Sequence, residues 1–100
     1  MKKNNNKKYG LCKEREVKKL LEDTGWVVTA SKGSFGVADL VAMHPAKGWK
    51  IVQVKATRQK KNVSYGKEID EIRHYQVPYN TQKELWAWRT KEGWERIVIG

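Results

Sequence analysis

Apolar residues recur along the chain in patterns that predict helices and strands in a definite order. A helix is predicted over residues 9–24, because its apolar positions follow the i, i+3, i+4, i+7 spacing of one buried stripe. Glu14 falls at the border of that stripe, whereas Glu16 points to solvent. Gly25 then suits the position that ends a helix. The stripe itself consists of Val17, Leu20, Leu21 and Thr24.

Short β-prone runs predict strands on either side of a second helix. That helix is expected over residues 67–75, where acidic side chains in the first turns suit the helix dipole. A Pro/Gly turn at residues 45–48 makes the two strands around it a hairpin. The order of elements is α-β-β-β-α-β-β, which predicts an α/β fold: a single small domain with a central mixed β-sheet flanked by helices. The predicted strands are residues 26–30, 37–44, 50–56, 84–89 and 94–99.

The composition of the chain indicates the class of partner to expect. One hundred residues, 39% of them hydrophobic, make one domain with a modest core. The formal net charge of +10 favours a polyanionic partner, nucleic acid before an anionic membrane. The single Cys12 gives no reason to expect secretion, and the basic N-terminus lacks the apolar region of a signal peptide. Residues 1–8 are predicted to be a basic flexible tail, free in solvent or lying along a phosphate backbone, ahead of a domain over residues 9–100.

Candidate chemistry gathers on the central hairpin. Asp39 has apolar neighbours, among which a carboxylate needs a cation or hydrogen bonds to offset its burial. Gln53 and Lys55 are two residues apart and therefore leave the same face of the next strand. With Glu14 they offer oxygen ligands for Mg²⁺ and a group that orients water, which is what phosphodiester hydrolysis needs. The alternatives are a salt-bridged acid for Asp39, a solvent-facing lysine for Lys55 and a helix-surface ion pair for Glu14.

Two polar, basic segments are candidates for contacts with DNA. Backbone N–H groups, hydroxyls and lysine side chains in such segments bind phosphates. The alternatives are an ordinary turn for the first segment and a solvated run of charge for the second. The candidate DNA-binding residues are Ser31, Lys32 and Ser34 in the first segment, and Arg58, Lys60, Lys61 and Lys67 in the second.

Several short segments, taken in order, carry a family resemblance. They are Tyr-Gly-x-x-Lys-Glu-Arg-Glu-Val at 9–17, Gly-Trp-Val-Val at 25–28, Gly-Ser at 33–34, Asp-Leu-Val-Ala at 39–42 and Val-Gln-Val-Lys at 52–55. Together with Tyr-Gly-Lys at 65–67, they resemble the PD-(D/E)xK nuclease superfamily and, within it, the archaeal-type Holliday junction resolvases. The resemblance covers residues 9–100 and implies a restriction-endonuclease-like nuclease domain.

The resemblance also implies an activity and a set of site residues. It implies a Mg²⁺-dependent endodeoxyribonuclease, with Mn²⁺ as a possible substitute, that acts as a homodimer on four-way DNA junctions in recombination and repair. Glu14 matches the family's helix glutamate, Asp39 its central metal aspartate and Lys55 its catalytic lysine. Gln53 stands where the family usually has a metal-binding Glu, so the site carries one negative charge fewer. Neither a small-molecule cofactor nor a membrane is implied, and the expected location is the cytoplasm, that of the host if the source is a virus.

Other interpretations stay open at this point. The same fold can cut other DNA, as a nicking, repair or restriction-type enzyme, and a basic chain can bind DNA or RNA without chemistry. Ser31 and Ser34 lie where the family places a hydroxyl near the active site, and either can correspond to it. Lys55 acts as a general base or as an electrostatic anchor for water. Trp86 and Trp88 share one face of a strand and mark either the core or a dimer interface.

Overall fold

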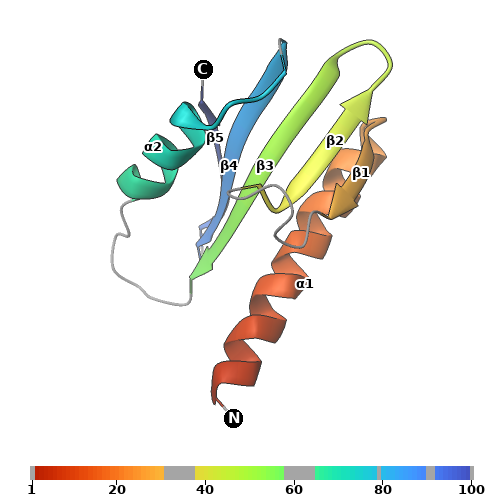
Figure 1. Ribbon diagram of the computed structural model, residues 1–100. Helices are drawn as coiled ribbons and strands as arrows, with labels where there is room; N and C mark the ends of the chain where they lie inside the picture. The colour runs from red at the N-terminus through yellow and green to blue at the C-terminus, as the bar shows by residue number, and fades with distance from the viewer. Residues whose placement is uncertain (1, 31–37, 58–64, 79, 90–91, 100) are drawn as a thin grey trace.

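The computed structural model describes residues 2–30, 38–57, 65–78, 80–89 and 92–99, with only the backbone of residues 2–8 and 57. The predicted α/β class and the order α-β-β-β-α-β-β are confirmed (Figure 1). The helices are α1 (Lys2–Asp23) and α2 (Gly66–His74), and the strands are β1 (Val27–Ala30), β2 (Leu40–His44), β3 (Gly48–Thr57), β4 (Thr81–Arg89) and β5 (Gly93–Ile99).

The five strands form one mixed sheet in the order β1-β2-β3-β4-β5. Neighbouring strands are antiparallel except for β3 and β4, which run parallel. A parallel pair needs a crossover connection, and α2 lies within the segment that joins β3 to β4. The hairpin predicted around residues 45–48 is present, with Gly48 at a positive φ of 86° that favours glycine. His44 ends β2, and its imidazole Nδ1 accepts a hydrogen bond from the Ala46 N–H, which stabilises the turn.

The two helices cover opposite faces of the sheet. The register aligns Val52 with Glu84 and Gln53 with Leu85, so alternate residues of β3 and β4 belong to alternate faces. One face carries the core cluster under α1, which consists of Val17, Leu21, Trp26, Val28, Leu40, Ala42 and Val52. The other carries the cluster under α2, which consists of Tyr65, Ile72, Leu85, Ala87 and Ile99.

Helix α1 is longer than predicted. It begins at Lys2, so residues 2–8, for which the sequence predicted a flexible tail, are helical. This segment contains neither Pro nor Gly and its lysines are good helix formers, while continuity with the helix that follows offsets the weaker propensity of its three asparagines. The division of the chain into a tail and a separate nuclease domain stays a prediction. Within the described residues, no helix is both long and apolar enough to cross a lipid bilayer.

Candidate functional site

Asp39 lies at the point where the ladder between β2 and β3 ends. Its N–H donates to the Val52 carbonyl oxygen at 2.9 Å, and its Oδ2 accepts the Val54 N–H at 2.7 Å. The side chain therefore holds a strand N–H of β3 with one carboxylate oxygen. Burial raises the pKa of Asp39, and the Val54 hydrogen bond and the Lys55 charge offset only part of that rise. A partly buried carboxylate of this kind is one that a bound cation would stabilise.

Gln53 and Lys55 project from β3 on the same side of the sheet as Asp39. Leu40 pairs with Val52, so the residue before Leu40 lies opposite Gln53, and side chains opposite each other share a face. The Gln53 Oε1 is buried and has no hydrogen-bond partner among the described residues. A buried oxygen without a partner is costly, and a cation or an ordered water removes that cost. Lys55 is partly exposed, and its charge acts on the Asp39 carboxylate.

Glu14 approaches this group from α1. It is partly exposed while Glu16 is exposed, as the helical spacing predicted. Burial raises the pKa of Glu14, and the negative charge of Asp39 raises it further. Two partly buried carboxylates that repel each other are both stabilised when a cation binds near them. The structure thus places Glu14 close enough to Asp39 for their charges to interact, and its role as a metal ligand stays a prediction.

A lysine next to Glu14 anchors this part of α1 to the sheet. The Lys13 Nζ lies 3.7 Å from the ring centroid of Trp88 on β4, and it also pairs with Glu16 at 2.9 Å. A cation over an indole face is a favourable contact. Trp88 in turn packs against Trp94 at 5.2 Å between ring centroids. The sequence alone did not single out Lys13, although it directly precedes Glu14. Its role depends on the contact with Trp88, and no local sequence pattern predicts that contact.

The donor set at this place fits a magnesium ion. It consists of two carboxylates and one amide oxygen, and Mg²⁺ is usually held by one or two carboxylates with water completing its shell. Among the residues that the structure describes, no three His, Cys, Asp or Glu side chains come together, so the third protein ligand would be the amide of Gln53. The orphaned Gln53 Oε1 supports that arrangement.

Of the predicted DNA-binding residues, Lys67 lies within the described part of the chain. Ser31, Lys32, Ser34, Arg58, Lys60 and Lys61 lie outside the described residues. Lys67 is described and is exposed in the first turn of α2. The two segments that contain the unplaced residues leave β1 and β3 and lead back to Asp39 and to α2, so they are joined to the elements that carry the candidate site.

Comparison with known proteins gives a family. A family model described as archaeal Holliday junction resolvase (Hjc) matches residues 5–99, nearly the whole chain. No curated protein matches the sequence.

Proposed function

Because the chain belongs to the archaeal Holliday junction resolvase family, a family of nucleases that act on four-way DNA junctions, we propose that it resolves such junctions by metal-dependent paired nicks. Two observations support the metal dependence: the negative charge of Asp39 acts on the Glu14 carboxylate, and the Gln53 oxygen on the strand next to Asp39 is buried without a hydrogen-bond partner among the described residues. A protein that acts on DNA in this way is expected in the cytoplasm.

In this proposal the chain's own residues hold the metal and orient the scissile phosphate. Asp39, Gln53 and Glu14 would bind a Mg²⁺ ion, which when bound stabilises charge on the phosphate and lowers the pKa of water. The hydrogen bond from the Val54 N–H keeps the Asp39 carboxylate in one orientation. The contact of Lys13 with the Trp88 ring fixes the part of α1 that carries Glu14 against the sheet. Lys55 supplies a positive charge on the side of the sheet where the phosphate would lie.

Lys55 is best suited to act as an electrostatic anchor. Its positive charge lies close enough to the Asp39 carboxylate to offset part of the rise that burial causes in the pKa of Asp39. A lysine ammonium has three hydrogen-bond donors, which suit contacts to a water or to a phosphate oxygen. We therefore assign it the role of orienting the attacking water and neutralising the phosphate.

Cleavage of a labelled four-way junction tests the proposal directly. Each of the four strands is labelled in turn, and the junction is compared with a linear duplex of the same sequence, in Mg²⁺, in Mn²⁺ and in EDTA. Symmetric nicks on two opposing strands, lost in EDTA, are expected. Equal cleavage of the linear duplex would replace the resolvase by a less selective nuclease of the same fold, and cleavage in EDTA would remove the metal from the proposal.

Gln53→Glu is expected to strengthen Mg²⁺ binding about tenfold, or about 1.4 kcal/mol, because the attraction between the ion and a third carboxylate outweighs the added repulsion among the carboxylates. Calorimetric titration of the protein with Mg²⁺ measures the effect. The matched control is Gln82→Glu, which adds the same charge at an exposed position of β4. Equal affinities in Gln53→Glu and wild type would show that residue 53 does not touch the metal.

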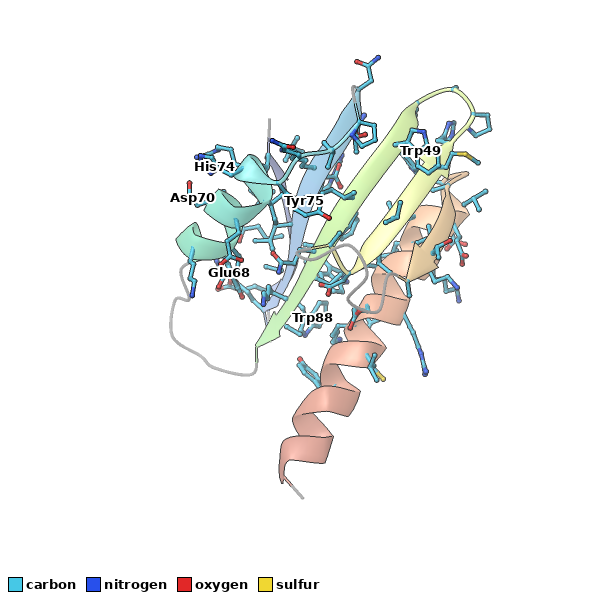
Figure 2. The ribbon with its side chains drawn as sticks, viewed as in Figure 1. Trp49, Glu68, Asp70, His74, Tyr75 and Trp88 are labelled. Atoms are coloured by element: carbon cyan, nitrogen blue, oxygen red, sulfur yellow. The ribbon has the colours of Figure 1, made fainter. Side chains whose placement is uncertain are left out.

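We also propose that the chain acts as a homodimer through an apolar part of the sheet that α2 leaves open. Val27, Met43 and Trp49 lie side by side across β1, β2 and β3, and 61%, 40% and 48% of their surfaces are exposed. Next to Trp49 is a hollow of about 400 Å³ whose walls include Ile51 and Tyr75. Figure 2 shows Trp49 beside the β2–β3 turn and Tyr75 beyond the end of α2. Exposed apolar surface of this kind marks interaction sites, and paired nicks need two active sites.

Trp49→Glu is expected to dissociate the dimer. A central tryptophan typically contributes 2–4 kcal/mol to an interface, so the dissociation constant should rise about 30-fold or more. Light scattering over a dilution series measures it. Val98→Glu is the control, because Val98 is 63% exposed and aligned with Glu84, on the opposite face. Dissociation by Val98→Glu and not by Trp49→Glu would move the interface to the α1 side.

A further inference from the structure

A hollow lined by tryptophans and cations lies on the α1 side of the sheet, away from the candidate nuclease site. It has a volume of about 580 Å³, which is within the size range of ligand pockets. The C-terminal turn of α1 and the β2–β3 turn border it. The side chains that matter for its chemistry are Trp26, Trp86, Trp94, Lys47, Lys50 and Arg96. These six residues are called the tryptophan hollow below.

One buried carboxylate fixes the walls of the tryptophan hollow. Glu84 on β4 has no exposed surface, and it accepts hydrogen bonds from the Trp86 Nε1 at 2.9 Å and from Arg96 at 2.6 Å. The Lys50 Nζ pairs with the same carboxylate at 3.1 Å and lies 4.3 Å from the ring centroid of Trp26. An indole and two cations are therefore held in one orientation before any ligand arrives, which lowers the entropic cost of binding.

The charge around the hollow favours an anion. Lys47, Lys50 and Arg96 surround it, while Glu84 is the acid to which two of them are bonded. The described walls thus carry an excess of positive charge. The side chain of Arg96 is 51% exposed although it is bonded to Glu84, so part of its guanidinium faces solvent. Lys47 is exposed in the β2–β3 turn. Both can contact a phosphate at the rim.

The tryptophans favour a planar ring. Trp86 and Trp94 are partly exposed, with their ring centroids 6.0 Å apart and their planes inclined at 70°. Indole surfaces beside cations are the chemistry with which proteins hold bases of single-stranded nucleic acids. A base in an intact duplex is stacked on both sides and cannot enter such a hollow. We propose that the tryptophan hollow binds an unpaired nucleotide of single-stranded DNA, with its base against Trp86 and Trp94 and its phosphate against Lys47 and Arg96.

This site is independent of the nuclease proposal. Glu84 and Trp86 of β4 are aligned with Val52 and Val54 of β3 and share their face of the sheet. Gln53 and Lys55 leave the opposite face. A chain without nuclease activity would still have the tryptophan hollow, and a nuclease without the hollow would still cut. Binding of unpaired DNA therefore can be measured in EDTA, where cleavage of DNA cannot confuse the result.

Indole N–H signals of ¹⁵N-labelled protein test the proposal. The chain has five tryptophans, and single Trp→Phe variants assign their signals. Titration with a (dT)₁₂ oligonucleotide in EDTA should shift the Trp86 and Trp94 signals and leave Trp49 in place. Trp49 is the internal reference, because it lies on the opposite face of the sheet and outside the hollow. Shifts that are largest at Trp49, or none at Trp86 and Trp94, would overturn the proposal.

A charge-matched pair of variants adds a second readout. Lys47→Gln removes a rim charge, and Lys19→Gln removes the same charge from an exposed position of α1 outside the hollow. Lys47→Gln should weaken (dT)₁₂ binding about three- to tenfold and lower the log–log salt slope by roughly 0.7, the value for one phosphate contact on a single strand. Equal effects of the two variants would overturn the proposal. Binding of thymidine 3′,5′-bisphosphate as tight as that of (dT)₁₂ would assign the hollow to free nucleotides instead.

Discussion

Asp39→Asn is expected to reduce cleavage of a four-way junction by about a thousandfold or more, while junction binding in EDTA changes less than about twofold. The loss follows because the amide removes the negative charge at the centre of the proposed ligand set, and groups that stabilise transition-state charge typically contribute factors of this size. The shape of the site is kept, since the Asn oxygen can accept the Val54 N–H as the Asp39 Oδ2 does. Single-turnover cleavage of the labelled junction measures the rate.

The stability of this variant separates a catalytic role from a structural one. Burial raises the pKa of Asp39, which means that the folded protein disfavours the ionised side chain. The neutral Asn should therefore leave the melting temperature unchanged or raise it, as is common where a site is built for function rather than stability. Asp70→Asn is the matched control, because Asp70 is exposed on α2 and points away from the sheet (Figure 2). Full cleavage by Asp39→Asn would remove Asp39 from the site.

The central part of the candidate site was predictable because it depends on short-range rules. The period of two along a strand puts Gln53 and Lys55 on one face, and a short turn fixes the register of the hairpin that brings Asp39 opposite Gln53. The period of a helix separates Glu14 from Glu16 in the same way. Each of these placements needs only a few neighbouring residues to be assigned correctly.

The contacts that hold the site together were not predictable, because they depend on a long-range pairing. The parallel register of β3 with β4 brings Lys50 beside Glu84 and places Trp88 under Lys13. No local sequence pattern predicts which residues of two strands far apart in the chain are aligned. A buried Glu also looks like a surface residue in a sequence, since glutamate is rarely buried without a partner and the cations that pair with Glu84 come from other strands.

The first residues of α1 were missed for a different reason, which is local. Residues 2–8 lack apolar side chains, and the absence of a buried stripe predicted a tail. Intrinsic propensity and continuity with the helix that follows were sufficient to extend it to Lys2. Hydrophobic periodicity reports which part of a helix is packed, whereas it does not report how far the helix continues beyond the packed part.

Glu84→Ala is expected to lower the free energy of unfolding by about 3–5 kcal/mol, because it leaves the ammonium of Lys50 buried without a counter-ion. The Lys50 side chain is 5% exposed, and Glu84 is the carboxylate that pairs with it at 3.1 Å. For a domain of this size each kcal/mol corresponds to roughly 4–8 °C in melting temperature, so the loss should be large in a thermal scan. Urea unfolding followed by circular dichroism gives the free energy itself.

The control for lost packing is the double variant Lys50→Met with Glu84→Leu, which removes both charges and keeps the volume. It should recover most of the lost stability, since a buried ion pair replaced by apolar residues of similar size is often neutral. If the double variant is as unstable as Glu84→Ala, then packing and the hydrogen bonds of Trp86 and Arg96, rather than the unpaired charge, account for the loss.

The same network makes the stability of the wild type depend on pH. Burial alone would raise the pKa of Glu84, but hydrogen bonds from Arg96, Trp86 and Lys50 outweigh it, so the folded pKa is lowered. A lowered folded pKa means that the contribution to stability is complete above the unfolded value, about 4.3, and is lost as the pH falls through the folded value. Glu84→Gln lacks this ionisation, so the gap in unfolding free energy between wild type and Glu84→Gln should narrow below about pH 4. A gap that stays constant from pH 7 to pH 3 would show that the Glu84 charge does not stabilise the fold.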